Sequence, residues 1–350
     1  MSGIERLAET ISRDMERRLP GQRKTQRGKL SCLVATMLEV RSANLMDLAA
    51  CLPRPAERLD TRYQWIKRLL ANTRVVSDAV MAPYGREVLG RLSAGGQRIV
   101  LLIDQTQANE RHQAVMVAVR LGGRALPLAW RVKGTQGAIG FGEQREALQA
   151  AARLLPEGVK PVLMGDRFYG SPDLIAWCRD QGWDWRLRLK QDLLVFEDGG
   201  ETTLAECFGR GEHLLTDIEL TGKRVRTNVA MVHEDGHPEP WIIALSQTPS
   251  VHKAFDYGLR WGIEAMFSDF KSRGFGLEDS QIRISERLDR LILVMALALF
   301  WAVSTGMWDA ANRPTRAEKN PPTKDPRTMP DRSPRCSNAA SDAFTPASTA

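Results

Sequence analysis

Cysteine is scarce in this sequence, and the cysteines that occur are scattered. The chain has five of them in 350 residues: Cys32, Cys51, Cys178, Cys207 and Cys336. No two have the paired spacing of a zinc site or of a disulfide framework, so neither is expected. A protein without disulfides fits a reducing cytosol best, and we expect a cytoplasmic location.

Long hydrophobic runs are also missing. The longest, "LILVMALALFWAV" at residues 291–303, is shorter than the roughly 18 to 20 apolar residues that cross a bilayer. We interpret it as a helix of the protein core and expect no membrane partner. Residues 1–20 alternate charged and apolar positions at helical spacing and contain no apolar block, so no signal peptide is expected.

The remaining composition is that of a globular protein with a basic beginning. Hydrophobic residues make up 43% of the chain and charged residues 26%, and the length allows two domains and a substantial core. The net charge is +7, and residues 1–91 hold the whole excess, with 17 Lys and Arg against 10 Asp and Glu. This distribution indicates a polyanion-binding unit in front of a neutral catalytic one.

Residues 1–92 are predicted to be all-helical. Apolar residues recur at helical spacing, and prolines near positions 20 and 53 mark helix ends. Two helices meet at the second turn, and the later one carries Arg62, Lys67 and Arg68 away from its apolar side. This arrangement favours a helix-turn-helix-like motif that binds duplex DNA, with these three cationic side chains in contact with the DNA. A plain helical bundle with its cations in solvent remains an alternative.

Residues 93–308 are predicted to form an α/β catalytic domain. The pattern gives a buried strand at 98–104, a hairpin around Gly122 and Gly123, a helix, a short buried strand ending at Asp166, a helix capped by Ser171 with Pro172 in its first turn, and a strand. Alternating segments at about residues 191–250 predict an all-β insertion. Residues 309–350 are rich in proline and poor in aromatics, so a disordered tail is expected there.

Four polar residues stand out in "YGLRWGIEAMFSDFK" at residues 257–271. In one continuous helix, Tyr257, Arg260, Glu264 and Lys271 would share a stripe beside the apolar face. One acid with two cations and a phenol suits a site that holds a metal ion and phosphates. The alternative is a solvated face on which Arg260 and Glu264 form a helical ion pair.

Three acids are placed where an active site would form. Asp104 ends the first predicted strand, Asp166 ends the second buried strand, and Glu264 lies on the stripe. The ends of neighbouring parallel strands meet at one sheet edge. Three clustered carboxylates favour divalent cations, Mg²⁺ or Mn²⁺. Two such ions support displacement at phosphorus, so phosphodiester cleavage or strand transfer is expected.

These motifs resemble those of the DDE transposases of bacterial insertion sequences. The resemblance rests on Asp104 in "DQT", Asp166 in "GDRFYG", and the spacing of Tyr257, Arg260, Glu264 and Lys271. It spans roughly residues 25–308. The spacing is that of the cut-and-paste branch with the Tyr-Arg-Glu-Lys signature. The resemblance implies an RNase H-like core with a β-rich insertion, and excision followed by integration of DNA.

The resemblance also implies roles for single residues. The three acids would bind two Mg²⁺ or Mn²⁺ ions per active site, and Tyr257, Arg260 and Lys271 would hold DNA phosphates. Arg167, next to an acid, would orient its loop or contact DNA, with a structural ion pair as the alternative. Family members stack a flipped base on an aromatic of the insertion. Trp241 is the candidate here, but its strand context favours core packing, so it receives no role.

The implied partners are double-stranded DNA, both terminal inverted repeats and target DNA, and a second copy of the chain. The resemblance thus implies a homodimer on DNA in the nucleoid. Family members often continue into a C-terminal helical region that supports dimerisation, whereas this chain has a proline-rich segment there. A catalytically defective copy that binds DNA and represses transposition therefore stays open as an alternative.

Overall fold

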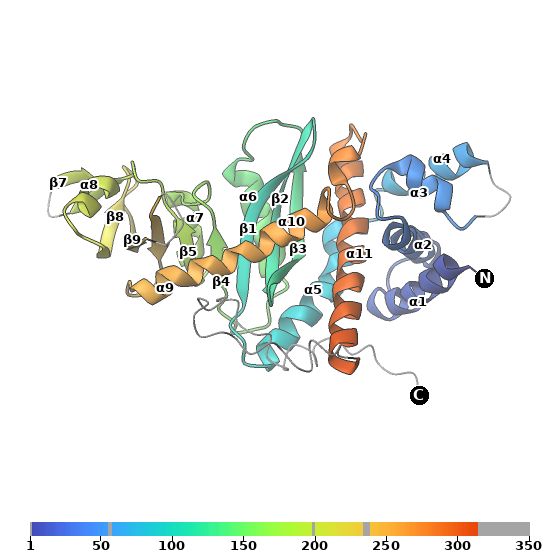
Figure 1. The fold of residues 1–350 in the computed structure, drawn as a ribbon, viewed down its shortest axis with the longest axis horizontal. Helices are drawn as coiled ribbons and strands as arrows, with labels where there is room; N and C mark the ends of the chain where they lie inside the picture. The colour runs from blue at the N-terminus through green and yellow to red at the C-terminus, as the bar shows by residue number, and fades with distance from the viewer. Residues whose placement is uncertain (1, 55–57, 198–199, 234–238, 314–350) are drawn as a thin grey trace, which may run out of the picture.

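The computed structural model describes residues 2–54, 58–197, 200–233 and 239–313, and Figure 1 shows its fold. A group of helices occupies one end, a long mixed sheet runs through the middle, and a β-rich extension forms the other end. One long helix, α11, stands between the N-terminal helices and the sheet. The N-terminal helices are α1 (Gly3–Arg18), α2 (Lys24–Val40), α3 (Leu45–Cys51) and α4 (Leu59–Leu70).

Local chemistry explains where several helices begin. Ser2 and Glu5 form a capping box at the start of α1, each side chain bonding the other's backbone. Asn44 caps α3 by accepting from the amide of Met46 at 2.9 Å. The predicted cap at Ser171 is confirmed, since its side chain accepts from the amide of Leu174 at the start of α7 (Pro172–Asp180).

All described strands belong to one mixed ten-stranded sheet with the order β3-β2-β1-β4-β5-β10-β9-β8-β6-β7. In its centre β1, β4 and β5 are parallel, and the other pairs are antiparallel. This α/β arrangement behind an N-terminal helical region is consistent with an RNase H-like core. The strands are β1 (Val100–Asn109), β2 (His112–Leu121), β3 (Arg124–Lys133), β4 (Val162–Gly165), β5 (Asp184–Arg188), β6 (Leu194–Glu197), β7 (Gly200–Thr203), β8 (Leu214–Leu220), β9 (Val225–Val232) and β10 (Trp241–Leu245).

The predicted insertion differs from the structure in one way. It is not all-β, because α8 (Leu204–Gly209) lies within it, started by a capping box of Thr203 and Glu206. Its last strand, β10, pairs antiparallel with β5, so the inserted strands continue the central sheet outward.

Helices cover both faces of the central strands. The remaining elements are α5 (Ser77–Ala94), α6 (Phe141–Ala152), α9 (Val251–Phe255), the 3₁₀ helix η1 (Asp256–Trp261), α10 (Gly262–Phe270), the 3₁₀ helix η2 (Leu277–Asp279) and α11 (Ser285–Asn312). The α9-η1-α10 segment runs obliquely across the sheet (Figure 1). A small second cluster, containing Trp241 and Tyr257, packs beneath it, which confirms core packing for Trp241.

Helix α11 joins the N-terminal helices to the sheet. It packs on α2 on one side and on β3 and α5 on the other, and one hydrophobic cluster extends from Ile11 to Phe300. Helix α5, predicted to belong to the helical domain at 1–92, packs on β3. Helix α11 ends at Asn312, beyond the predicted boundary at 308, and the predicted tail lies outside the described residues from position 314 on.

By length and composition, α11 could also cross a membrane. Within the described part of the chain it is the one helix that passes this test, and 56% of the relevant window is buried inside the protein. Its first half, from Leu288 to Phe300, is buried almost without interruption. This burial is what the sequence interpretation of residues 291–303 as a core helix requires.

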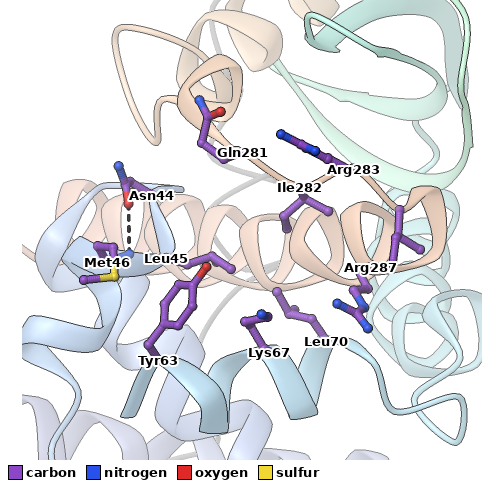
Figure 2. Close-up of a pocket in the computed structure, with 11 residues that line it drawn as sticks. Asn44, Leu45, Met46, Tyr63, Lys67, Leu70, Gln281, Ile282, Arg283 and Arg287 are labelled. Atoms are coloured by element: carbon purple, nitrogen blue, oxygen red, sulfur yellow. Dashed lines mark hydrogen bonds between the residues drawn. The ribbon is translucent and has the colours of Figure 1, made fainter. Parts of the chain in front are cut away.

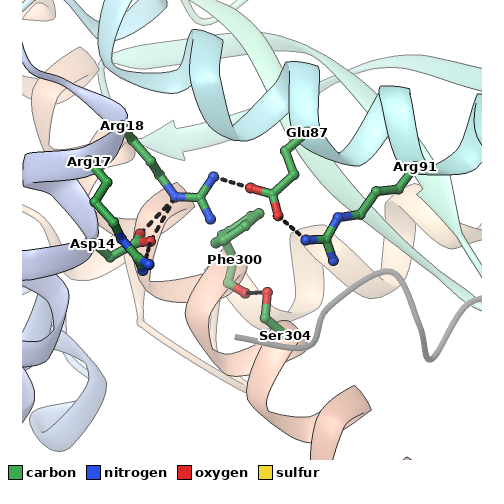
Figure 3. Close-up of polar contacts among 7 residues, drawn as sticks. All are labelled: Asp14, Arg17, Arg18, Glu87, Arg91, Phe300 and Ser304. Atoms are coloured by element: carbon green, nitrogen blue, oxygen red, sulfur yellow. Dashed lines mark hydrogen bonds and ion pairs between the residues drawn. The ribbon is translucent and has the colours of Figure 1, made fainter. Parts of the chain in front are cut away.

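A polar network fixes α1 to α5 next to α11 (Figure 3). Arg18 donates from Nε to Asp14 Oδ2 at 2.8 Å, and its Nη1 contacts Glu87 on α5. Its guanidinium also lies over the Tyr84 ring, 4.7 Å from the centroid. The Phe300 ring of α11 is 5.7 Å away. One cation therefore connects three helices from distant parts of the sequence.

We expect Arg18→Met to lower the free energy of unfolding by about 2 to 3 kcal/mol, because Asp14 and Glu87 would lose their shared, largely buried partner. The matched control is Arg17→Met. Arg17 pairs with the same Asp14, but its side chain is 63% exposed against 21% for Arg18. The control should change stability by no more than about 0.5 kcal/mol in chemical denaturation. Equal effects of the two substitutions would contradict a connecting role for Arg18.

Candidate active site

Asp104 and Asp166 are brought together by the register of two parallel strands. Ile103 of β1 pairs with Gly165 of β4, so the next residue on each strand is an aspartate. Asp166 directly follows β4, as predicted. Asp104 does not end its strand, however, because β1 continues to Asn109 as the hairpin partner of β2. Asp104 instead lies at the level where pairing with β4 stops, which leaves its side chain beside Asp166.

The loop after Asp166 is held tightly by two glycines. A Cβ atom on Gly165 would lie 2.7 Å from the Tyr169 Cβ, and one on Gly170 would lie 2.1 Å from the carbonyl oxygen of Arg188. Asp166 itself accepts from the amide of Phe168 at 2.8 Å through Oδ1. The "GDRFYG" motif is therefore a close-packed turn that orients the carboxylate.

The segment that carries Glu264 is not the continuous helix that the spacing predicted. It consists of the short α9, the 3₁₀ helix η1 and then α10. In a 3₁₀ helix, residues three apart point in the same direction, so Tyr257 and Arg260 are aligned within η1. Lys271 is the C-terminal cap of α10, outside regular helical geometry, so the four residues do not share one stripe.

Arg260 lies between two of the predicted acids. Its Nη1 donates to Asp104 Oδ2 at 3.0 Å and its Nη2 donates to Glu264 Oε1 at 2.7 Å. The side chain of Arg260 is 10% exposed, that of Asp104 15%, and that of Glu264 44%. The i, i+4 ion pair considered as an alternative therefore exists, and the same guanidinium also reaches the acid on β1.

Of the other two signature residues, Tyr257 adjoins this bridge, with the Arg260 guanidinium 5.8 Å from its ring centroid, and Lys271 pairs elsewhere. Tyr257 is buried, with its ring 5.3 Å from that of Trp241 in an edge-to-face arrangement. Burial, together with the nearby Asp166, raises the pKa of Tyr257 to about 12. Lys271 pairs with Glu278, in η2, at 2.9 Å.

Further cations lie at the turn that follows Asp166. Arg167 is half exposed and donates to Glu239 Oε2 at 2.7 Å. Arg188, at the end of β5, lies 3.7 Å from the same carboxylate and lines a cavity with Arg167 and Lys190. Burial and the neighbouring Arg167 lower the pKa of Arg188. Sequence reasoning missed Arg188, although the alternation in "WRLRLK" puts it on the same face of its strand as Arg186 and Lys190.

Negative charge is concentrated around Asp104. Burial, followed by the charge of Asp166, raises the pKa of Asp104 to about 6, against the opposing effect of Arg260, and Glu264 contributes to the rise. Tyr169 lies beside the same acids, and its hydroxyl group is buried without a hydrogen-bond partner in the described structure. Unsatisfied polar groups beside clustered carboxylates are consistent with a site that takes a hard cation.

The donor chemistry thus fits a divalent ion, but the present spacing does not yet form a complete site. Within the described residues, no three His, Cys, Asp or Glu side chains are grouped closely enough to hold a metal ion. The Arg260 bridge explains this spacing, because its guanidinium lies between Asp104 and Glu264.

The three cations predicted to contact DNA differ in their surroundings on α4. Arg62 is partly buried, and its Nη1 donates to the carbonyls of Ala50 and Leu52. It therefore satisfies backbone acceptors at the C-terminal end of α3. Lys67 is partly buried beside Tyr63 and lines a cavity. Arg68 is exposed.

Part of the chain, including most of the candidate site, matches a known protein family. Residues 142–301, just under half of the chain, match the model of the transposase DDE domain family. The chain carries a transposase DDE domain. It is therefore an enzyme, a catalytic polynucleotidyl transferase that functions in DNA transposition, and such transposases use divalent metal ions. No curated protein sequence matches the chain.

The matched segment contains part of the candidate site. It includes Asp166, Arg260 and Glu264, and begins after Asp104. Asp104 is connected to the transposase domain by strand pairing with β4 and by its bond to Arg260. Physical contact therefore links the acid before the match to the two acids within it.

We expect Asp104→Asn to change the pH dependence of stability. Because the folded-state pKa is raised, protonation of Asp104 stabilises the fold; this contribution is complete below the ordinary value of 3.8 and is lost as the pH rises through about 6. In metal-free unfolding measurements, the stability of the variant relative to the parent should rise by about 1 to 3 kcal/mol between pH 4 and pH 7. Asp173→Asn, at a surface ion pair, should show no such rise. A flat difference for Asp104→Asn would contradict the described charge cluster.

We expect Gly170→Ala to lower the free energy of unfolding by about 2 kcal/mol or more, because the new Cβ would collide with the Arg188 carbonyl. Gly142→Ala is the matched control. Its Cβ in the first turn of α6 would meet nothing within 4 Å, and stability should stay the same or rise by up to about 1 kcal/mol. Thermal and denaturant unfolding would measure both. A tolerated Gly170→Ala would mean that the turn after Asp166 is not tightly constrained.

Proposed function

We propose that this transposase belongs to the cut-and-paste branch with the Tyr-Arg-Glu-Lys signature. In this proposal it cleaves DNA at the terminal inverted repeats of an insertion sequence and transfers the freed 3′ ends into target DNA. The observation that carries the proposal is the meeting of Asp104 and Asp166 on adjacent parallel strands, with Arg260 linking Asp104 to Glu264.

Asp104, Asp166 and Glu264 are the proposed ligands of two Mg²⁺ or Mn²⁺ ions. When bound, such ions would activate the attacking oxygen and stabilise the leaving oxygen of a displacement at phosphorus. The raised pKa of Asp104 supports the assignment, since a cation would favour the charged form of this acid. The half-exposed Glu264 is the acid best able to move, because it lies on α10 outside the sheet.

Arg260 would have two successive partners. With no DNA bound it neutralises Asp104 and Glu264. A DNA phosphate offers a guanidinium comparable paired bonds, so substrate binding would release Glu264 for the metal site. Tyr257 and Lys271 are proposed as further phosphate contacts. Arg167 currently forms the ion pair considered as its alternative, and exchange of Glu239 for a phosphate would turn it toward DNA.

The basic N-terminal helices are the proposed DNA-binding unit. Residues 1–91 hold the chain's entire excess of positive charge, and Arg68 is exposed on α4. We propose that a homodimer holds two element ends and acts in the cytoplasm at the nucleoid.

A catalytically defective copy that binds element ends and represses transposition is the second candidate. The specific observation that favours it is the Arg260 bridge, which keeps Asp104 and Glu264 apart. The two candidates share DNA binding and differ in cleavage. Incubation of the purified protein and Mn²⁺ with labelled DNA from the borders of the coding region separates them, because only the transposase produces nicks.

We expect Glu264→Gln to keep the affinity for this DNA within about twofold while lowering cleavage by roughly a thousandfold or more, the scale of losing a catalytic group. Glu157→Gln, in an exposed loop, is the matched control and should cleave like the parent. Binding of all three proteins should weaken steeply with salt as counterions are released. Cleavage that survives in Glu264→Gln would remove this residue from the proposed metal site.

A further inference from the structure

A cavity of about 430 Å³ lies where the N-terminal helices meet the chain segment that leads from α10 into α11 (Figure 2). Helix α4 contributes Tyr63, Lys67 and Leu70 to one side. The other side is formed by residues 281–284 and Arg287 at the beginning of α11. The cavity therefore lies between the proposed DNA-binding unit and the segment that follows α10, the helix that carries Glu264.

Three cations line this cavity: Lys67, Arg283 and Arg287. Within the described part of the chain none of them forms a salt bridge, in contrast to Arg260, which pairs with Asp104, and Lys271, which pairs with Glu278. The Lys67 ammonium lies 5.4 Å from the centre of the Tyr63 ring. Three unneutralised positive charges converging on one cavity attract an anion with several charges.

The floor of the cavity is apolar. Leu70 is 1% exposed and Ile282 8%, with Leu45 and Tyr63 partly buried beside them. Figure 2 shows Tyr63 and Leu70 facing Ile282 across the space. A ligand that fits must combine anionic groups with flat or apolar ones, and a nucleic acid strand does so through its phosphates, sugars and bases.

Hydrogen bonds connect the wall of the cavity to the end of β1, the strand that also carries Asp104. Asn109, at the end of β1, donates from Nδ2 to the carbonyls of Ile282 at 3.0 Å and Ser280 at 3.4 Å. On the other side, the amide of Ala43, just before α3, donates to the carbonyl of Phe275. The strand that carries Asp104 and the entrance to α3 are thus both fixed to this segment.

From these observations we propose that the cavity binds the DNA backbone, with Lys67, Arg283 and Arg287 on phosphates and Tyr63 against a sugar or base. The inference rests on the proposed function, because DNA is the substrate there, and it adds a contact site outside the acids and their signature residues. DNA bound here would touch the helical unit and the catalytic unit at once. It would set their spacing on the element end.

The test uses the full chain and fluorescein-labelled duplex DNA from the borders of the coding region. Arg283→Ala should weaken binding about 3- to 10-fold, and Arg283→Ala with Arg287→Ala should weaken it further. The slope of log affinity against log salt should fall by about one for each lost phosphate contact. The matched control is Arg153→Ala, at an exposed residue that ends α6 and does not line the cavity, which should leave affinity and slope unchanged. Thermal unfolding confirms that each variant is folded.

The outcomes separate this inference from the proposed function. If the parent binds and nicks DNA while the double variant keeps the same affinity and salt slope, the inference is wrong and the function stands. If the parent neither binds nor nicks DNA, both are wrong. If the variants change the oligomeric state in size-exclusion chromatography and leave DNA affinity unchanged, the cavity contacts a second copy of the chain, and the DNA assignment is overturned.

Discussion

The candidate active site depends on one guanidinium between two carboxylates. Arg260 is almost fully buried and bonds Asp104 on the sheet and Glu264 on α10. Without this cation, the charges of Asp104, Asp166 and Glu264 would repel one another in a poorly solvated place. The bridge therefore allows the acids to lie close together, and it also keeps Glu264 at a defined distance from the sheet.

The rest of the fold can be understood as support for this meeting point. Strand pairing fixes the level of Asp104 against Asp166, and the close-packed turn after Asp166 fixes its direction. The α9-η1-α10 segment crosses the sheet on a small cluster of its own, with Trp241 and Tyr257 at its centre. Helix α11 then connects the sheet to the N-terminal helices through a continuous core. Elements distant in sequence thus converge on a few side chains.

Local patterns predicted the elements whose causes are local. Continuous apolar runs identified the strands before Asp104 and Asp166, and Ser171 with Pro172 identified the start of α7. Other features were missed. Asp104 lies within its strand because a tight hairpin turn at Glu110 and Arg111 pairs β1 with β2 and extends β1 to Asn109, and this turn contains no Gly or Pro that would have marked it in the sequence. The spacing of the four residues from Tyr257 to Lys271 is compatible both with one continuous α-helix and with the observed break into η1 and α10. The sequence spacing therefore could not predict the 3₁₀ geometry. Helix α8 is different, because the Thr203 and Glu206 capping box was visible in the sequence and was overlooked.

The inserted strands have a mechanical consequence. Because β10 pairs with β5, the extension shares backbone hydrogen bonds with the strands beside the acids, and it cannot swing on a hinge without breaking that ladder. Rearrangement around a substrate must therefore fall on the parts outside the sheet, namely the oblique α9-η1-α10 segment and the short helices α3 and α4. The continuous ladder thus makes the sheet the rigid part of the protein, and the helices packed on its surface are the parts that are free to shift.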